Sequence, residues 1–226
     1  MESCAVLFVK NPEAGKVKTR LQTACTPREA ARLYRAFVLD SAAALAASGA
    51  ELKVVAYAPA GAGADIAALL GDGPWELVPQ PETDLGGRMD GLMRWSFGRG
   101  SRRTVIIGSD SPSLPAARID EALEALKGRD LVLGPSTDGG YYLVGQSRAD
   151  SAPFEGVEWS SGRVLEQTLE KCAHLDMGLL PPWYDVDTPS EAAFLRVHLR
   201  ALRRAGEASG EHSLPVLEGI ELPPPS

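Results

Sequence analysis

The chain has 226 residues, a formal net charge of −7 and a pI near 5.1. This length fits one large domain, and the acidic balance argues against a broad surface for nucleic acid or anionic membranes. Three cysteines without a CxxC pair indicate neither a zinc site nor a disulfide framework. With no long apolar run and no charged-then-apolar leader, we expect a soluble, cytoplasmic protein without nucleic-acid or membrane partners.

The first predicted element is a strand from Cys4 to Val9, followed by a basic loop. Six apolar residues in a row are typical of a strand that is covered on both faces in a parallel sheet. The loop surrounds Pro12 and Gly15 with four cations: Lys10, Lys16, Lys18 and Arg20. Open α/β sheets bind ligands at the carboxyl ends of their strands, so this loop favours a phosphate-rich ligand. A solvated basic loop is the alternative.

Helix and strand signals alternate along the rest of the chain. A capping box at Thr26 to Glu29, with Pro27 at the first helical position, opens a helix that Gly49 ends. Further strands are expected at 52–58, 75–79, 104–107, 131–133 and 141–144. Further helices are expected at 88–97, 116–126, 163–175 and 188 to about 205, with an Ala-rich segment at 62–70. The alternation predicts a single α/β domain over residues 1–205, with three α/β/α layers around a mainly parallel sheet, and a loosely attached tail over 206–226.

Several common nucleotide and hydrolase motifs are missing from the sequence. Lys18-Thr19 lacks the glycines of a Walker motif, and Gly61-Ala62-Gly63 lacks the third glycine of the dinucleotide fingerprint. No Gly-x-Ser-x-Gly elbow occurs. The sequence therefore argues against a P-loop enzyme, a dehydrogenase of the fingerprint type and a serine hydrolase.

Acidic residues follow two of the later segments. Asp110 comes directly after a buried apolar strand, and a carboxylate at that edge suits Mg²⁺ or Mn²⁺ bridged to a diphosphate. A turn that caps the next helix is the alternative. Asp185 and Asp187 share one side of an extended segment, so one could complete a metal site while the other orients a base or a hydroxyl. Charge complementarity at the following helix N-terminus is the alternative for this pair.

Two glycine-containing segments complete the candidate site. The first runs from Asp84 through Gly86 to Arg88 before a predicted helix, and it is either a turn that contacts a nucleotide or a plain loop. The second contains, in order, Asp138, Gly139, Gly140, Tyr141 and Tyr142. Its glycines allow backbone to approach a ligand closely, and its tyrosines offer hydroxyls or stacking faces. A hairpin turn alone would also explain Asp138-Gly139.

The chain resembles, from residue 4 to about 200, a bacterial glycosyltransferase-like family with the nucleotide-diphospho-sugar transferase (GT-A, Rossmann-like) fold. Some members of that family are assigned to arsenosugar biosynthesis. The resemblance rests, in chain order, on FVKNPEAGKVKTRL, QPETDLGGRM, IIGSDSPSL, GPSTDGGYYLVG, the Trp159-Ser160 pair and WYDVDTP. The layout is also similar to the molybdenum-cofactor and phospholactate guanylyltransferases, which share a basic N-terminal loop that ends near Lys-x-Arg-Leu.

This resemblance implies roles for individual residues. It implies that Lys10, Lys18 and Arg20 hold phosphates, with Gly15 and Lys16 in the same loop. It implies that Asp110 and Asp187 hold Mg²⁺ or Mn²⁺. The chain departs from the usual glycosyltransferase Asp-x-Asp, because Ser111-Pro112 follows Asp110. That departure favours the two separated acids of the nucleotidyltransferases.

The resemblance also implies a metal-dependent transferase that acts on a nucleoside triphosphate or a nucleotide-sugar and a small-molecule acceptor. For nucleotidyl transfer, Lys18 and Arg20 would stabilise charge on the leaving pyrophosphate; for glycosyl transfer, Asp138 or Asp185 would be the base. We expect the nucleotide base near 9–10 and 84–88, and the acceptor near Tyr141, Tyr142 and Trp159. A non-catalytic nucleotide or nucleotide-sugar binding protein of the same fold is the alternative, which the presence of both acids disfavours.

Overall fold

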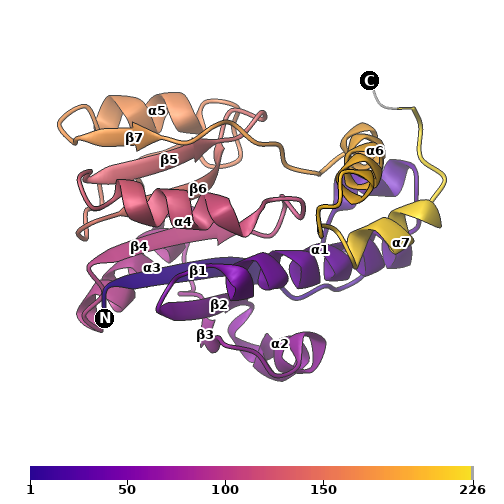
Figure 1. Ribbon diagram of the computed structural model, residues 1–226, viewed down its shortest axis with the longest axis horizontal. Helices are drawn as coiled ribbons and strands as arrows, with labels where there is room; N and C mark the ends of the chain where they lie inside the picture. The colour runs from indigo at the N-terminus through magenta and orange to yellow at the C-terminus, as the bar shows by residue number, and fades with distance from the viewer. Residues whose placement is uncertain (225–226) are drawn as a thin grey trace.

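The computed structural model describes residues 1–224, which form a seven-stranded sheet with helices on both faces (Figure 1). The strands are β1 (Ser3–Lys10), β2 (Leu52–Ala58), β3 (Glu76–Pro79), β4 (Arg103–Gly108), β5 (Leu131–Pro135), β6 (Tyr141–Gln146) and β7 (Met177–Leu179). The helices are α1 (Pro27–Ala47), α2 (Gly63–Leu70), α3 (Leu85–Gly98), α4 (Ala116–Ala125), α5 (Val164–Lys171), α6 (Pro189–Arg204) and α7 (Ser213–Glu218). Two short 3-10 helices are η1 (Thr19–Thr23) and η2 (Ala60–Ala62). Over residues 1–224 no helix combines the length and the apolar character that a bilayer crossing requires.

The sheet has the strand order β3-β2-β1-β4-β6-β5-β7. Only β6 runs antiparallel to its neighbours, so the expected mainly parallel sheet is confirmed. β1 is central, and its Leu7 faces Val55 of β2 on one side and Ile107 of β4 on the other. This register brings the carboxyl ends of β1 and β4 to the same edge of the sheet.

Two apolar clusters, one on each face of the sheet, produce the three layers. Side chains alternate along β1, so that Ala5, Leu7 and Val9 join one cluster while Cys4 and Val6 join the other. The first cluster includes residues of α1, α2, α4, α6 and α7. The second includes residues of α3 and packs against α5. The expected three-layer α/β/α architecture is therefore confirmed.

Helix caps explain where several helices begin. Thr26 and Thr188 each form a capping box, and each is followed by proline at the first helical position, as expected. α3 starts earlier than expected, because the Asp84 side chain accepts a hydrogen bond from the Gly87 amide at 2.8 Å. The glycine turn expected at 84–88 is therefore the first turn of a helix. β7 is three residues long and was not expected.

The C-terminal segment is packed rather than loosely attached, in contrast to the expectation. α7 lies against α1 and α6, and its Leu214 and Leu217 are at most 1% exposed. The carboxylate of Asp40 in α1 accepts hydrogen bonds from the backbone amides of His212 and Ser213, at 3.0 and 2.9 Å, and from the Ser213 hydroxyl. The segment was expected to be loosely attached because its Gly, Ser and Pro content is typical of loops, although it includes this short apolar helix. Residues 225–226 of the expected tail lie outside the described residues.

We predict that Asp40→Ala destabilises the protein by about 1–3 kcal/mol, because it leaves buried amides at the start of α7 without an acceptor. Urea denaturation of the full chain measures this change. Glu124→Ala, which removes an exposed carboxylate from α4, is the control and should change stability by no more than about 0.5 kcal/mol. Equal stability of the two variants would show that Asp40 does not anchor the segment.

Candidate functional site

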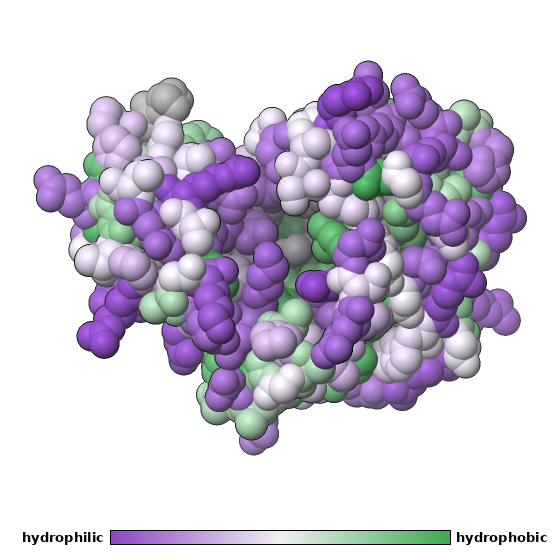
Figure 2. Space-filling model, turned by 180° about the vertical axis from the view of Figure 1, so that it is seen from behind, coloured by the Kyte–Doolittle hydropathy of each residue, from purple (hydrophilic) through white to green (hydrophobic). Residues whose placement is uncertain are grey.

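A cavity of about 630 Å³ opens at the carboxyl edge of the sheet. It is lined by the ends of β1 and β4, the loop after β1, the start of β6, residues 159–162 and the segment before α6. One face of the molecule is hollowed near its centre, where polar and apolar side chains meet (Figure 2). The cavity thus lies where an open α/β sheet binds its ligands.

Most of the expected site residues line this cavity. They are Lys10, Lys16, Lys18, Arg20, Arg88, Asp110, Asp138, Gly140, Tyr141, Tyr142, Trp159, Asp185 and Asp187. Four other expected residues, all in the described part of the chain, are absent from the lining: Gly15, Asp84, Gly86 and Gly139.

The residues outside the lining have structural tasks near the cavity. A Cβ atom on Gly86 would lie 2.6 Å from Nε1 of Trp159, so glycine lets α3 pack closely against that indole. Gly139 has a φ of +91°, and a Cβ there would overlap the carbonyl oxygen of Gly162. Asp84 caps α3. These glycines set the positions of the cavity walls.

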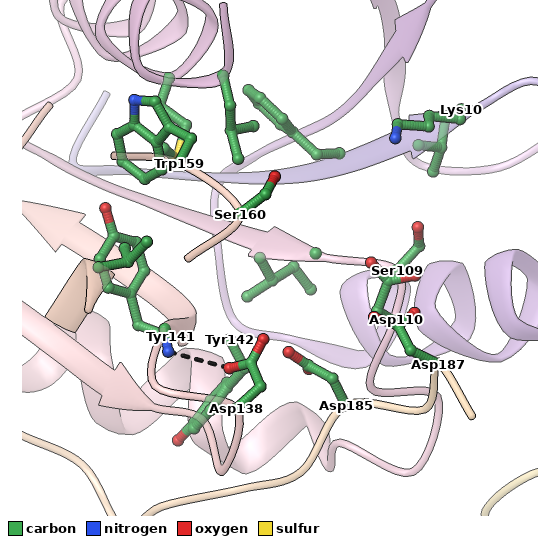
Figure 3. A pocket seen from close by; sticks show the side chains of 18 of the residues that line it. Lys10, Ser109, Asp110, Asp138, Tyr141, Tyr142, Trp159, Ser160, Asp185 and Asp187 are labelled. Carbon is green, nitrogen blue, oxygen red and sulfur yellow. Dashed lines mark hydrogen bonds between the residues drawn. The ribbon is translucent and has the colours of Figure 1, made fainter. Parts of the chain in front are cut away.

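An ionic triad lies at the centre of the site. The Nζ atom of Lys18 is 2.5 Å from Oδ1 of Asp110 and 2.8 Å from Oδ1 of Asp187. The Lys18 side chain is only 3% exposed, whereas those of Asp110 and Asp187 are 49% and 39% exposed. Figure 3 shows the two carboxylates beside each other at one end of the cavity. The triad joins the loop after β1, the end of β4 and the segment before α6.

The charges of the triad stabilise one another. Burial alone would lower the pKa of the Lys18 ammonium, but the two carboxylates outweigh burial and raise that pKa above its usual value. Burial alone would raise the pKa of Asp187, but Lys18 and Arg20 outweigh it and hold that pKa below its usual value. Lys18 and Asp187 are therefore both charged at neutral pH.

The other cations of the basic loop differ in how they are engaged. Lys16 is 71% exposed and pairs with Glu13 at 2.6 Å. Lys10 and Arg20 are exposed, line the cavity and make no ion pair with any of the described residues. Outside this loop, Arg88 of α3 donates from Nε to the carbonyl of Thr83 at 2.8 Å. Lys10 and Arg20 are thus the cations of this loop whose charged ends are available to an anionic ligand.

Two further carboxylates lie at the side of the cavity opposite Lys10 (Figure 3). Asp185 accepts a hydrogen bond from the Ser111 hydroxyl at 2.5 Å, and Asp138 accepts one from the Gly140 amide at 2.9 Å. Burial raises the pKa of Asp185 to about 6, and the charges of Asp110 and Asp138 add to the rise. Tyr141 and Trp159, which also line the cavity, meet edge to face with ring centroids 6.4 Å apart.

Sequence reasoning assigned no role in the site to the lining residues Tyr34, Ser109 and Ser160. The Tyr34 hydroxyl accepts from the Lys10 amide at 3.1 Å and bonds the Ser109 hydroxyl at 2.7 Å, so it ties α1 to the ends of β1 and β4. Tyr34 lies on the apolar face of α1, so the sequence pattern indicates a core residue. Ser160 has a φ of 66°. Among residues 1–224, Lys18 and Ser160 are the two non-glycine residues with positive φ, and both line the cavity. Such backbone strain often marks functional sites but is not visible in a sequence.

The donor set fits a divalent ion that is shared with a ligand. No group of three metal-ligating side chains is formed within residues 1–224. The carboxylates of Asp110 and Asp187 both contact the Lys18 ammonium, so they converge on one point at the cavity that they line. Mg²⁺ is commonly held by one or two carboxylates together with substrate phosphates and water. The pair therefore suits an ion of that kind better than a closed protein cage.

Comparison with solved structures supports the fold. A protein from Desulfovibrio desulfuricans G20, provisionally named a nucleotide-diphospho-sugar transferase, is 36% identical with a TM-score of 0.88, over 97% of this chain and 95% of that one. CMP:2-keto-3-deoxy-manno-octonic acid synthetase, solved with CTP, is 13% identical with a TM-score of 0.52, over 91% and 100% of the two chains. A nucleotidyl transferase from Methanothermobacter is 15% identical with a TM-score of 0.54, over 90% and 99%. These two distant likenesses concern the fold alone.

Sequence comparisons place the chain in a family. No curated protein matches the sequence significantly. A family model matches residues 39–161, a range that includes α3, β4, Asp110 and the 138–142 turn. The expected likeness to nucleotide-diphospho-sugar transferases and nucleotidyltransferases is confirmed at the level of structure. The chain belongs to the bacterial family described as uncharacterized protein conserved in bacteria (DUF2064).

Proposed function

We propose that this protein is a metal-dependent transferase that acts on a nucleoside triphosphate or a nucleotide-sugar and a small-molecule acceptor. The observation that carries the proposal is the pairing of opposite charges around one cavity. Lys10 and Arg20 present unpaired cations to it, and Asp110 and Asp187 present a pair of carboxylates. A nucleoside diphosphate unit with a divalent ion has the complementary charges.

The basic loop supports phosphate binding. Lys10 ends β1 and Arg20 lies in η1, so both cations are held by regular structure at the carboxyl edge of the sheet. Charge-assisted hydrogen bonds to phosphate oxygens are short and strong, and donors fixed in advance stabilise charge that develops on a leaving phosphate. Arg20 and Lys10 are the residues that we assign to this task.

The acid pair supports metal binding. Asp110 and Asp187 would hold Mg²⁺ or Mn²⁺ through the oxygens that face the cavity. When bound, such an ion neutralises phosphate charge and screens the leaving group. The tasks of the protein are to hold the two carboxylates at one point and to orient the nucleotide against the acceptor.

The opposite side of the cavity supports an acceptor with a hydroxyl group. Asp185 has a carboxylate whose pKa of about 6 is closer to neutral pH than that of an ordinary aspartate, a property that suits a general base. Asp138 lies beside it and is the other candidate. Two carboxylates would repel an anionic acceptor, whereas Tyr141 and Trp159 offer ring edges and faces to an uncharged one.

A turnover assay with product analysis tests the proposal. Purified protein is incubated with Mg²⁺ or Mn²⁺ and each of a panel of nucleoside triphosphates and nucleotide-sugars. We expect a thermal shift with at least one nucleotide, because a ligand at 100 times its dissociation constant adds about 2.7 kcal/mol. Release of pyrophosphate identifies nucleotidyl transfer, and release of a nucleoside diphosphate identifies glycosyl transfer. Binding without turnover under all conditions identifies a nucleotide-binding protein, and the absence of any shift contradicts the proposal.

We predict that Arg20→Met and Lys10→Met each weaken binding of the nucleotide about 10- to 100-fold, because a charge-assisted hydrogen bond contributes about 1.5–3 kcal/mol. Binding of the corresponding nucleoside should change little. Isothermal titration measures both affinities. Lys16→Met is the matched control, since it removes an exposed lysine of the same loop that pairs with Glu13. Equal losses for nucleotide and nucleoside would indicate damage to the fold.

We predict that Asp185→Asn lowers turnover about 100-fold or more while nucleotide affinity stays within about twofold, because a lost general base slows the chemical step. Asn retains an oxygen that can accept from Ser111. Asp187→Asn should instead raise the metal concentration required for half-maximal rate. Steady-state kinetics with metal titration separates the two effects. If Asp185→Asn has the same turnover as the unmodified protein, Asp185 is not the general base.

A further inference from the structure

The position of Lys18 differs from that of a phosphate-binding lysine. Its ammonium contacts Asp110 and Asp187, and its side chain is nearly buried. The same nitrogen lies 5.8 Å from the ring centroid of Tyr34 and 5.5 Å from that of Phe37. Two carboxylates and two aromatic rings therefore surround this charge, whereas Lys10 and Arg20 are exposed to the cavity.

The backbone also fixes this arrangement. Lys18 has φ 48° and ψ 45°, a left-handed conformation that disfavours residues with a side chain. It directly precedes η1, whose Leu21 amide donates to the Lys18 carbonyl at 3.1 Å. Strain of this kind persists only where the surroundings determine the conformation, and here both ends of the residue are held. The ammonium is a fixed part of the site.

A fixed ammonium changes what the acid pair can bind. Without Lys18, two carboxylates that converge on one point would repel each other, and a divalent ion would relieve that repulsion. With Lys18 in place, one ammonium already offsets part of the negative charge of the two carboxylates, and a free divalent ion has to compete with a cation that is attached to the chain. An ion that arrives with phosphates brings further oxygen ligands and negative charge, which compensate for the lysine.

We propose that Lys18 is a positioning residue that holds Asp110 and Asp187 together and keeps a divalent ion from binding to this pair until a nucleotide accompanies it. The nucleotide in this inference rests on the proposed function. Lys18 then makes no essential contact with phosphate, which differs from the role implied by resemblance. The divalent ion and the nucleotide then bind together, and the protein without nucleotide does not hold the ion at this acid pair.

The test measures divalent-ion binding without nucleotide. Mn²⁺ titrations followed by electron paramagnetic resonance, together with thermal unfolding at the same concentrations, are performed on the full chain. Lys18→Met keeps the length of the side chain but removes its charge. We expect Mn²⁺ to bind this variant at least about tenfold more tightly than the unmodified protein, because the competing charge is gone. Added Mn²⁺ should also raise the melting temperature of the variant but not that of the unmodified protein.

Two control variants locate the effect. Lys16→Met removes a cation from the same loop outside the triad, so it should bind Mn²⁺ as the unmodified protein does. Lys18→Met combined with Asp110→Asn should lose the gained affinity, because one ligand is missing. If Lys18→Met binds Mn²⁺ no better than the unmodified protein, the inference is wrong.

A second comparison tests the inference even if Lys18→Met does not fold. In the absence of nucleotide, the unmodified protein and Asp110→Asn should bind Mn²⁺ equally weakly, because the acid pair is closed to the ion in both. A loss of Mn²⁺ affinity on replacing Asp110 would show that the pair already holds the ion and would overturn the inference.

The outcome is separable from that of the proposed function. A protein that binds no nucleotide would contradict the proposed transferase but would leave the Mn²⁺ results intact. If Lys18→Met instead loses nucleotide affinity without gaining Mn²⁺ affinity, Lys18 is a phosphate contact. The transferase would then stand and this inference would fail.

Discussion

The candidate site depends on the ion pairs that Lys18 makes with Asp110 and Asp187. These residues come from the loop after β1, the end of β4 and the start of α6, which are far apart in the sequence. A backbone bond from the Val186 amide to the Asp110 carbonyl, at 2.9 Å, joins two of these segments next to the ion pairs. The Lys18 side chain is nearly buried, so removing either carboxylate leaves its charge less compensated, and each member constrains the positions of the others.

The central strand explains why these segments can meet. β1 is buried on both faces and pairs with β2 and β4, so its carboxyl end opens between two neighbouring strand ends. Tyr34 reinforces this edge by bonding the Lys10 amide and the Ser109 hydroxyl. The backbone at Lys10, where the basic loop begins, is therefore held in place. Flexible loops are common at ligand sites, but here α1, β1 and β4 hold the loop at its base.

Charge is distributed unevenly around the cavity, and this distribution favours binding of the two substrates at different sides. Lys10 is drawn at the far side of the cavity from Asp138 and Asp185 (Figure 3). The triad, in which one ammonium lies between two carboxylates, is near Asp185, since Asp110 contributes to the raised pKa of that residue. An anionic donor and an uncharged acceptor would thus be drawn to different sides, with the acid pair between them. Such separation orients two substrates before any chemistry takes place.

The sequence predicted most of the elements and many of the residues that line the cavity because these depend on local pattern. The apolar run of β1, the capping boxes of Thr26 and Thr188, and the acids after strand ends can all be identified without a structure. The packing of α7 could not be predicted, since it depends on Asp40, a buried acid that lies 172 residues before His212 in the chain. Tyr34 was missed for a similar reason, because its hydroxyl acts at the end of a helix face that otherwise belongs to the core.

The role of Lys18 shows most clearly where reasoning from sequence ends. A lysine in a basic loop at a strand end has the composition of a phosphate ligand, and nothing in its neighbours distinguishes it from Lys10 or Lys16. The distinction arises from exposure and backbone conformation, which place one ammonium between two carboxylates and leave the others toward solvent. The four cations of this loop thus have different tasks: Lys18 contacts two carboxylates, Lys16 pairs with Glu13, and Lys10 and Arg20 face the cavity. Only the last two have charged ends that form no ion pair with the described residues, so the affinity for phosphate should follow the number of unpaired cations rather than the number of basic residues.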